Sequence, residues 1–234
     1  MLARKLYEIG AFLDKSRSPK GEGFRLVLHD KNPNAPLSPF YLNLRTSDNP
    51  KPGPLNKETL SMIGKELLTL ALRFVQRADY LAGVPRAGDP IVEAMREKIM
   101  EETKLTGLLG IHNRISSRRI RLVKQERDGK RAGVTIHEED VGLAKNGGLV
   151  ILVDDLITKA DSKLASIHCL EDAGFKVGDV MVVLDRQQGG GEELARAGYK
   201  LWPVFTINDL LFFYFREGVV TAKVYDEICR YLHG

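Results

Sequence analysis

Largely apolar, strand-like runs alternate with helical patterns through the middle of the chain, and this alternation constrains the fold more than any other feature. The runs at 79–84, 149–154 and 177–185 are apolar along most of their length rather than at every second residue. Strands of this kind, separated by helices, are typical of a parallel sheet with both faces covered. The sequence therefore predicts an α/β fold with a parallel-sheet, Rossmann-like core.

The rest of the pattern predicts one domain with a small N-terminal hood, a core and a C-terminal helix. We place the hood at about 1–54, the core at about 55–217 and the last helix at 218–234. The other elements are expected at 2–14 (helix), 24–29 and 40–44 (strands), 55–76 and 89–101 (helices), 106–112 and 134–138 (strands), 161–173 (helix) and 200–205 (strand), followed by two helices.

The chain carries a modest net charge that is unevenly distributed. Its 43% apolar and 28% charged residues are ordinary for a soluble globular protein. Segment 114–131 has eight Lys and Arg residues against two acids, so it contributes +6 to a net charge of +4. No apolar run approaches the roughly 18–20 residues that cross a bilayer, and the N-terminus lacks the apolar stretch of a signal peptide. We expect a cytoplasmic protein that does not bind membranes.

Three polar turns follow predicted strands, at 84–88, 154–162 and 185–191. In parallel sheets, ligands bind beyond the carboxyl ends of the strands. The carboxyl ends of parallel strands meet at one edge, so we expect these turns to lie side by side. This edge is the predicted binding site.

The turn at 154–162 combines acidic, hydroxyl and basic residues. Carboxylates such as Asp154 and Asp155 accept hydrogen bonds from ribose hydroxyls and attract Mg²⁺ with its waters, although an Asp here can also simply cap the next helix. Residues 158–162 precede a predicted helix, whose first N–H groups attract anions, and Thr158, Lys159 and Ser162 add donors and charge. The pattern therefore indicates a site for a sugar phosphate.

The stretch VILVDDLITKADSK (150–163) resembles the ribose-phosphate motif of type I phosphoribosyltransferases, and within them the orotate phosphoribosyltransferases. The resemblance covers roughly residues 1–217, in the expected order. The other stretches that carry it are SPFYLNLR (38–45), YLAGVPRAGDPIVEAM (80–95), MVVLDRQQGG (181–190) and FTINDLLFFYFREG (205–218). Together they imply a phosphoribosyltransferase-type core.

The resemblance implies a reaction in which orotate displaces pyrophosphate from phosphoribosyl pyrophosphate with Mg²⁺ present. Its motifs give Asp154 and Asp155 to the ribose hydroxyls and, through waters or the sugar phosphate, to the metal. The remaining assignments are the 5′-phosphate to Thr158, Lys159, Ala160, Asp161 and Ser162, orotate to Thr158 and Arg186, the base ring to Tyr41, the pyrophosphate to Arg86, and a mobile catalytic loop to Arg114 and Arg118. The family also implies a homodimer.

The chain departs from the family motif in the phosphate turn and in the catalytic loop. Lys159, Ala160 and Asp161 stand where the family has a small residue, a glycine and a hydroxyl residue. Asp161 either caps the following helix, which we favour, or points into the turn and repels a phosphate. In the loop, Lys124 and Lys130 replace Arg114 and Arg118 if the alignment shifts along the chain.

Three functions are compatible with these residues. The first is an orotate-type phosphoribosyltransferase. The second is a protein of the same fold that binds or senses a nucleotide or sugar phosphate without turnover. The third is a nucleic-acid binder that uses segment 114–131, although few aromatic residues lie among its charges and the same charges suit a lid over pyrophosphate.

Overall fold

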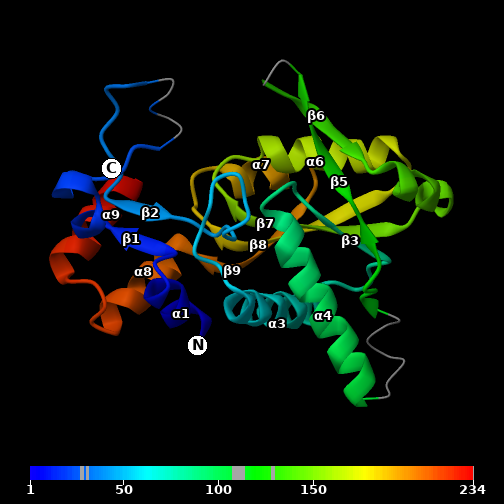
Figure 1. The fold of residues 1–234 in the computed structure, drawn as a ribbon, viewed down its shortest axis with the longest axis horizontal. Coiled ribbons are helices and arrows are strands. Elements are labelled where there is room, and N and C mark those ends of the chain that lie inside the picture. The colour runs from blue at the N-terminus through cyan, green and yellow to red at the C-terminus, as the bar shows by residue number, and fades with distance from the viewer. Residues whose placement is uncertain (27–28, 30–31, 107–113, 128–129, 234) are drawn as a thin grey trace. The chain divides into compact units, whose positions relative to one another are not determined.

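The computed structural model describes residues 1–26, 29, 32–106, 114–127 and 130–233 (Figure 1). These residues form two compact units, one of Met1–Leu55 with Ile207–Gly234 and one of Asn56–Thr206. The predicted strand at 106–112 lies outside the described residues from 107 onward, and Thr106 ends a helix. The helices and strands of the second unit are α3 (Lys57–Phe74), β3 (Tyr80–Gly83), α4 (Gly88–Thr106), β4 (Arg119–Ile120), β5 (Leu122–Arg127), β6 (Lys130–Ile136), the 3-10 segment Glu138–Asn146, β7 (Leu149–Ile157), α6 (Asp161–Asp172), β8 (Lys176–Asp185), α7 (Gly190–Arg196) and β9 (Lys200–Thr206).

The second unit is built on a five-stranded sheet in the order β4-β3-β7-β8-β9, and every neighbouring pair is parallel. This arrangement confirms the predicted α/β class. The three interior strands, β3, β7 and β8, carry runs of buried apolar residues. Continuous burial is expected where helices cover both faces of a parallel sheet.

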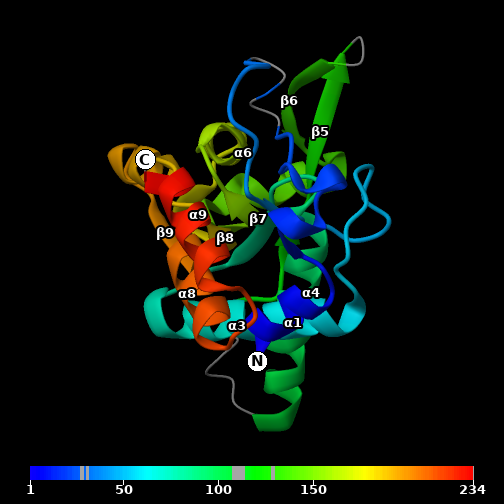
Figure 2. The same ribbon diagram turned by 90° about the vertical axis from the view of Figure 1, so that its left-hand side faces the viewer.

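Helices α3 and α4 cover one face of this sheet, and α6 and α7 lie on the other (Figures 1 and 2). On the α6 side, Val150 and Leu152 of β7 pack with Ile167 and Leu170 of α6 in one buried cluster. Asn56 caps α3, because its side-chain oxygen accepts a hydrogen bond from Thr59 N at 3.0 Å. Helix capping and the packing of apolar helix faces on the sheet thus stabilise this three-layer arrangement.

Helices α3 and α4 approach closely at Gly64, and this contact gives a stability prediction. A Cβ atom at Gly64 would overlap the backbone of Ala94 and Met95. Gly64→Ala is therefore expected to lower the free energy of unfolding by about 1–3 kcal/mol, as overpacking usually does. Denaturant unfolding checks this, with Gly178→Ala as the control, because a Cβ at Gly178 meets nothing within 4 Å. Equal effects of the two substitutions would contradict it.

The first unit contains α1 (Leu2–Glu8), β1 (Phe12–Asp14), two 3-10 turns (Lys15–Arg17 and Pro19–Gly21), β2 (Phe40–Leu42), α8 (Ile207–Arg216) and α9 (Ala222–His233). Strands β1 and β2 pair antiparallel. The buried rings of Phe12 and Tyr214 lie 5.0 Å apart at their centroids, and Tyr214 Oη donates to Ala3 O at 2.9 Å. Aromatic packing therefore joins the two ends of the chain within this unit.

Two predictions for the N-terminal part were wrong in detail. The helix expected at 2–14 ends at Glu8, since Gly10 adopts a positive φ of 76° and the chain then enters β1. The strand expected at 24–29 is reduced, among its described residues, to a bridge between Phe24 and Ser38. Apolar residues at helical spacing continue past Gly10, so spacing alone could not find this boundary.

Within the part of the chain that the structure describes, no helix combines the length and the apolar character that crossing a membrane requires.

Candidate active site at the carboxyl edge of the sheet

Strands β3, β7 and β8 are adjacent and parallel, so the turns that follow them share one edge of the sheet. The predicted neighbourhood of the three turns is therefore confirmed. The acid pair lies within the last part of β7, which runs to Ile157, whereas the sequence placed the strand end at 154. Pairing of β7 with β3 stops at Val153, but pairing with β8 continues to Asp185. The two carboxylates thus stand where one neighbouring strand has already ended.

Asp154 forms a buried ion pair with Lys163 of α6, a residue that the sequence analysis did not single out. Lys163 Nζ lies 2.6 Å from Asp154 Oδ2, and both side chains are about 5% exposed. The same Nζ donates to the carbonyl of Leu156 at 2.6 Å, and Asp154 Oδ1 accepts from the Asp155 N–H at 2.9 Å. Lys163 therefore balances one of the two negative charges at this edge.

Asp155 and Asp89 hold their protons more tightly than ordinary carboxyl groups. Burial, with a smaller contribution from Asp154, raises the pKa of Asp155 to about 7, and Lys163 acts against this shift. Burial raises the pKa of Asp89, at the start of α4, to about 6, although Arg119 opposes it. Carboxyl groups whose pKa lies near neutrality are frequent at functional sites. This edge can therefore change its charge within the physiological pH range.

The turn after β7 leads into α6, for which Asp161 was the expected N-cap. The N-cap position of α6 is Ala160, Asp161 is the first helical residue and exposed, and no side chain caps the helix by a hydrogen bond. The favoured prediction of an Asp161 cap was therefore wrong. Because Asp161 lies in the first turn, its negative charge still interacts favourably with the helix dipole.

A carboxylate from α7 contacts the same turn. Glu193 Oε2 accepts a hydrogen bond from the Ala160 N–H at 2.8 Å, and Glu193 Oε1 lies 3.3 Å from Lys159 Nζ. The Ala160 hydrogen bond, followed by Lys159, lowers the pKa of Glu193. Ala160 itself is fully buried. Two groups expected to bind a phosphate, a backbone donor and a lysine, thus already contact an internal carboxylate.

The turn after β8 is tied to the turn after β7 by backbone hydrogen bonds. The Arg186 N–H donates to Ile157 O at 3.0 Å, and the Gly190 N–H donates to Thr158 O at 3.1 Å. Gly189 between them has a φ of 97°, which glycine adopts without strain. The backbone of Arg186 therefore lies beside Ile157 and that of Gly190 beside Thr158, whereas the contacts of Arg186 and Thr158 with orotate stay a prediction. Ser162 lies in the first turn of α6, half-buried, beside Lys163.

The chain between β3 and α4 carries Arg86 toward a hairpin of the same unit. The Pro85–Arg86 peptide bond is cis, and Arg86 is exposed. Arg86 Nη2 lies 3.3 Å from Glu126 Oε1 on β5, and Lys124 Nζ lies 3.7 Å from the same oxygen. Strands β5 and β6 form this hairpin, which projects from the sheet in Figure 1. Two cations and one carboxylate therefore meet between the turn and the hairpin.

Comparison with known proteins places this geometry in a family context. No family model matches the chain. It is 29% identical over 173 residues to an orotate phosphoribosyltransferase of Nostoc, covering 74% of this chain and 72% of the relative. It is also 29% identical over 156 residues to that of Synechocystis, covering 67% and 70%.

Solved structures agree on the fold. The orotate phosphoribosyltransferase of Aeropyrum pernix matches with a TM-score of 0.62 at 23% identity, covering 94% of this chain and all of that one. The UMP synthase of Leishmania donovani matches with a TM-score of 0.64 at 20% identity, covering 99% of this chain and 41% of that one. The chain has the phosphoribosyltransferase fold, and its sequence is similar to those of orotate phosphoribosyltransferases.

Two arginines predicted for the catalytic loop of this phosphoribosyltransferase fold lie at the opposite edge of the sheet. Arg114 donates to the carbonyls of Leu72 and Val75 at the end of α3, at 3.0 and 2.8 Å. The guanidinium carbon of Arg118 lies 4.5 Å from the centroid of the Tyr80 ring, at the start of β3. In this chain the structure does not bring either arginine to the acid pair.

The reason is the position of the parallel strand along the sequence. Ala78 bridges Ile115, and Leu81 pairs with Arg119, so residues 114–118 run along the amino end of β3. The segment that leaves the carboxyl edge is the β5–β6 hairpin, which contains Lys124 and Lys130. These are the two residues that the sequence analysis kept as alternatives.

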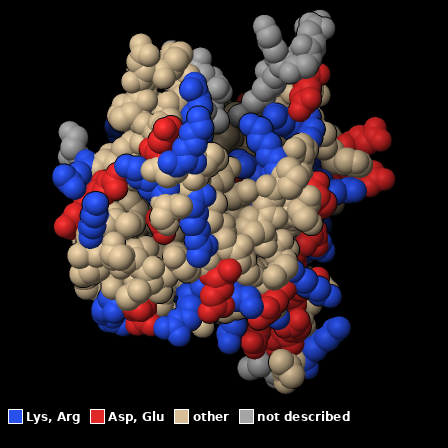
Figure 3. Space-filling model, turned by 60° about the vertical axis from the view of Figure 1, so that its left-hand side comes forward, with Lys and Arg blue, Asp and Glu red and all other residues tan. Residues whose placement is uncertain are grey.

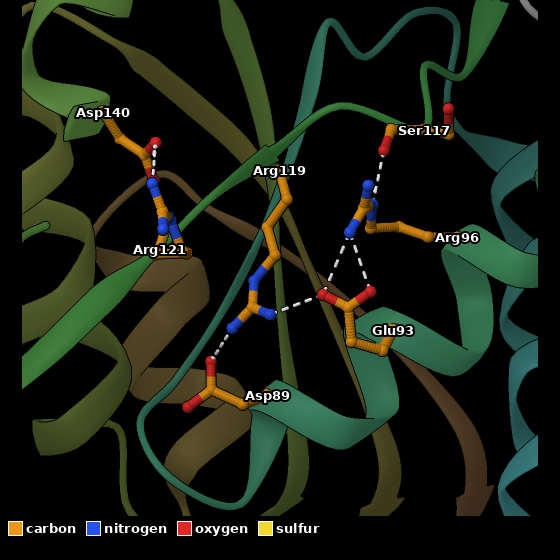
Figure 4. Close-up of polar contacts among 7 residues, drawn as sticks. All are labelled: Asp89, Glu93, Arg96, Ser117, Arg119, Arg121 and Asp140. Atoms are coloured by element: carbon orange, nitrogen blue, oxygen red, sulfur yellow. Dashed lines mark hydrogen bonds and ion pairs between the residues drawn. The ribbon is translucent and has the colours of Figure 1, made fainter.

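Arg119 joins β4 to the start of α4, and the sequence analysis missed it (Figure 4). Its guanidinium contacts both Asp89 and Glu93, and Glu93 also pairs with Arg96 at 2.7 Å. Arg96 Nε donates to Ser117 O at 2.6 Å. This network positions Asp89 next to the acid pair. Acids at i and i+4 at the start of a helix that follows a ligand turn are the signal that could have found it.

Tyr41 belongs to the first unit, where its ring stacks on Phe24 with 5.6 Å between centroids. Its predicted contact with the base stays a prediction.

Charge on the molecular surface is mixed. On the face drawn in Figure 3, Lys and Arg side chains lie in separate groups with Asp and Glu side chains among them. Several described arginines of segment 114–131 are paired, including Arg121 with Asp140 and Glu139 at 2.8 and 2.7 Å. Pairing of this kind lowers the net positive field that the sequence alone suggested.

Proposed function

We propose that this protein transfers the phosphoribosyl group of phosphoribosyl pyrophosphate to a pyrimidine base, with orotate as the acceptor. One observation carries the proposal: Asp154, Asp155, the turn at 158–162 and Arg186 converge on one edge of a phosphoribosyltransferase-type sheet. The names of its relatives, orotate phosphoribosyltransferases, support the same substrates.

The residues suit a reaction that depends on positioning and charge stabilisation. Asp155 is the candidate acceptor for ribose hydroxyls, because Lys163 already binds an oxygen of Asp154. Arg186 offers two parallel N–H donors to the carboxylate of orotate. Arg86, which pairs with Glu126 of the basic β5–β6 hairpin, and the hairpin itself are the candidates for contacting the leaving pyrophosphate and excluding water. Arginine keeps its charge, so these groups stabilise rather than donate protons.

Mg²⁺ would supply charge neutralisation on the pyrophosphate. Among the described residues, no group of three or more His, Cys, Asp or Glu side chains could hold a metal ion. We propose that the metal is held mainly by the substrate, with Asp154 and Asp155 acting through waters. We also propose a cytoplasmic homodimer, as the family resemblance implies.

Arg186→Ala is the variant that tests the substrate assignment. We expect kcat/KM for orotate to fall by about two orders of magnitude, since losing a charge-assisted two-pronged bond costs roughly 2–3 kcal/mol. Loss of orotate absorbance after addition of phosphoribosyl pyrophosphate and Mg²⁺ measures this. Arg196→Ala, at the exposed end of α7, is the matched control. Wild-type activity in Arg186→Ala would contradict the assignment.

A second candidate function is ligand binding without turnover. The Lys163–Asp154 ion pair favours it, because that pair leaves one carboxylate fewer for the ribose. Retained affinity for phosphoribosyl pyrophosphate, with no orotate consumption in the assay above, would select this function. The pairing of described arginines with acids speaks against a nucleic-acid binder.

A further inference from the structure

Glu193 is a built-in competitor for the phosphate of the ligand. We propose that its carboxylate occupies the phosphate turn in the free protein and that a sugar phosphate must displace it, so that Glu193 sets the affinity for phosphorylated ligands. This inference rests on the proposed function in one respect, namely that the turn at 158–162 binds a phosphate.

The contacts of Glu193 match those of a bound anion. One carboxylate oxygen accepts from the Ala160 N–H at 2.8 Å, and the other lies 3.3 Å from Lys159 Nζ. A backbone N–H at a helix N-terminus and a nearby lysine are also the donors that a phosphate uses. Carboxylate and phosphate oxygens cannot occupy the same donors together, so binding must exchange one for the other.

The surrounding structure holds Glu193 in place. Gly190 N donates to Thr158 O at 3.1 Å, and a Cβ at Gly190 would meet Ile157 and Thr158 O at 2.6 and 3.0 Å. The first residues of α7 are therefore packed against the turn, and Glu193 lies one helical turn further along, with 29% of its side chain exposed. The β8–α7 connection therefore places the backbone of Glu193 close to the turn.

Charge makes the competition effective. Lys159 contributes one positive charge to the turn, whereas Asp161 and Glu193 contribute two negative charges. Like charges a few ångströms apart repel, and solvent at the part-exposed side chain of Glu193 screens this repulsion only in part. Glutamine at position 193 would keep an oxygen acceptor for Ala160 and remove the charge.

The test compares Glu193→Gln with Glu192→Gln by calorimetric titration of ribose 5-phosphate. Glu192 lies in the same helix, is exposed, and carries the same charge, so it is the matched control. We expect Glu193→Gln to lower Kd at least about tenfold and Glu192→Gln to change it less than about twofold. Binding of orotate, which carries no phosphate, should be unchanged in both variants.

Equal affinities in wild type and Glu193→Gln, equal gains in the two variants, or no binding to any of them would overturn the proposal. Glu193→Ala, with thermal unfolding as a folding check, gives a second reading and should also bind more tightly. Failure of the proposed function has a different signature: no variant consumes orotate, yet Glu193→Gln still binds ribose 5-phosphate more tightly. If the protein turns over orotate and the KM for the sugar donor is the same in wild type and Glu193→Gln, only this inference is contradicted.

Discussion

Replacing Lys163 with methionine is expected to lower the free energy of unfolding by about 3–5 kcal/mol, the usual cost of leaving one partner of a buried ion pair alone. The side chains of Lys163 and Asp154 are each about 5% exposed, and their charged atoms lie 2.6 Å apart. Methionine keeps much of the side-chain volume, so the loss of stability comes mainly from removing the positive charge. Chemical denaturation measures it, and the melting temperature should fall by roughly 10 °C.

Two further variants separate the ion pair from general damage to α6. Lys176→Met removes an exposed lysine at the start of β8 and should change stability by less than about 0.5 kcal/mol. Asp154→Asn combined with Lys163→Met should cost clearly less than the sum of the single changes, since no unpaired charge remains. Strictly additive losses would show that the ion pair is not the source.

The prediction also has a pH signature. Asp155, with a pKa of about 7, is protonated at pH 5 and does not then need the positive charge of Lys163, so Lys163→Met should lose less stability at pH 5 than at pH 8. Lys163 opposes the raised pKa of Asp155, and its removal should therefore raise that pKa further.

The sheet and the position of the site followed from the sequence because both depend on local patterns. Continuous apolar runs predicted β7 and β8, and parallel topology then placed their turns at one edge. The alignment of segment 114–131 failed because β4 is a short edge strand. It consists of Arg119 and Ile120 alone, so the apolar run that marks β7 is missing there.

The partners inside the site could not be predicted, since each contact joins residues of different elements. The sequence pattern of α6 predicts that a lysine at position 163 is exposed, whereas the structure buries it. Glu193 reaches Ala160 across 33 positions of sequence, and Arg119 reaches Asp89 across 30. Helical and strand periodicities describe one element at a time and carry no information on such pairs.

Asp155→Asn is expected to make the protein more stable at pH 8 and much less active. The pKa of Asp155 in the folded chain is about 7, against an ordinary value of 3.8. Between these values the unfolded chain has released the proton and the folded chain still holds it. Folding is therefore progressively disfavoured as pH rises from about 4 to about 7, and the loss is complete above pH 7.

Asparagine cannot ionise, so Asp155→Asn should match the wild type near pH 4 and exceed its stability by roughly 2–4 kcal/mol at pH 8. Unfolding curves over this pH range measure the difference. Lower stability of Asp155→Asn at pH 8 would refute the assignment. In that case ionisation of the buried Asp155, the group proposed to bind the ribose, would not cost the fold stability at pH 8.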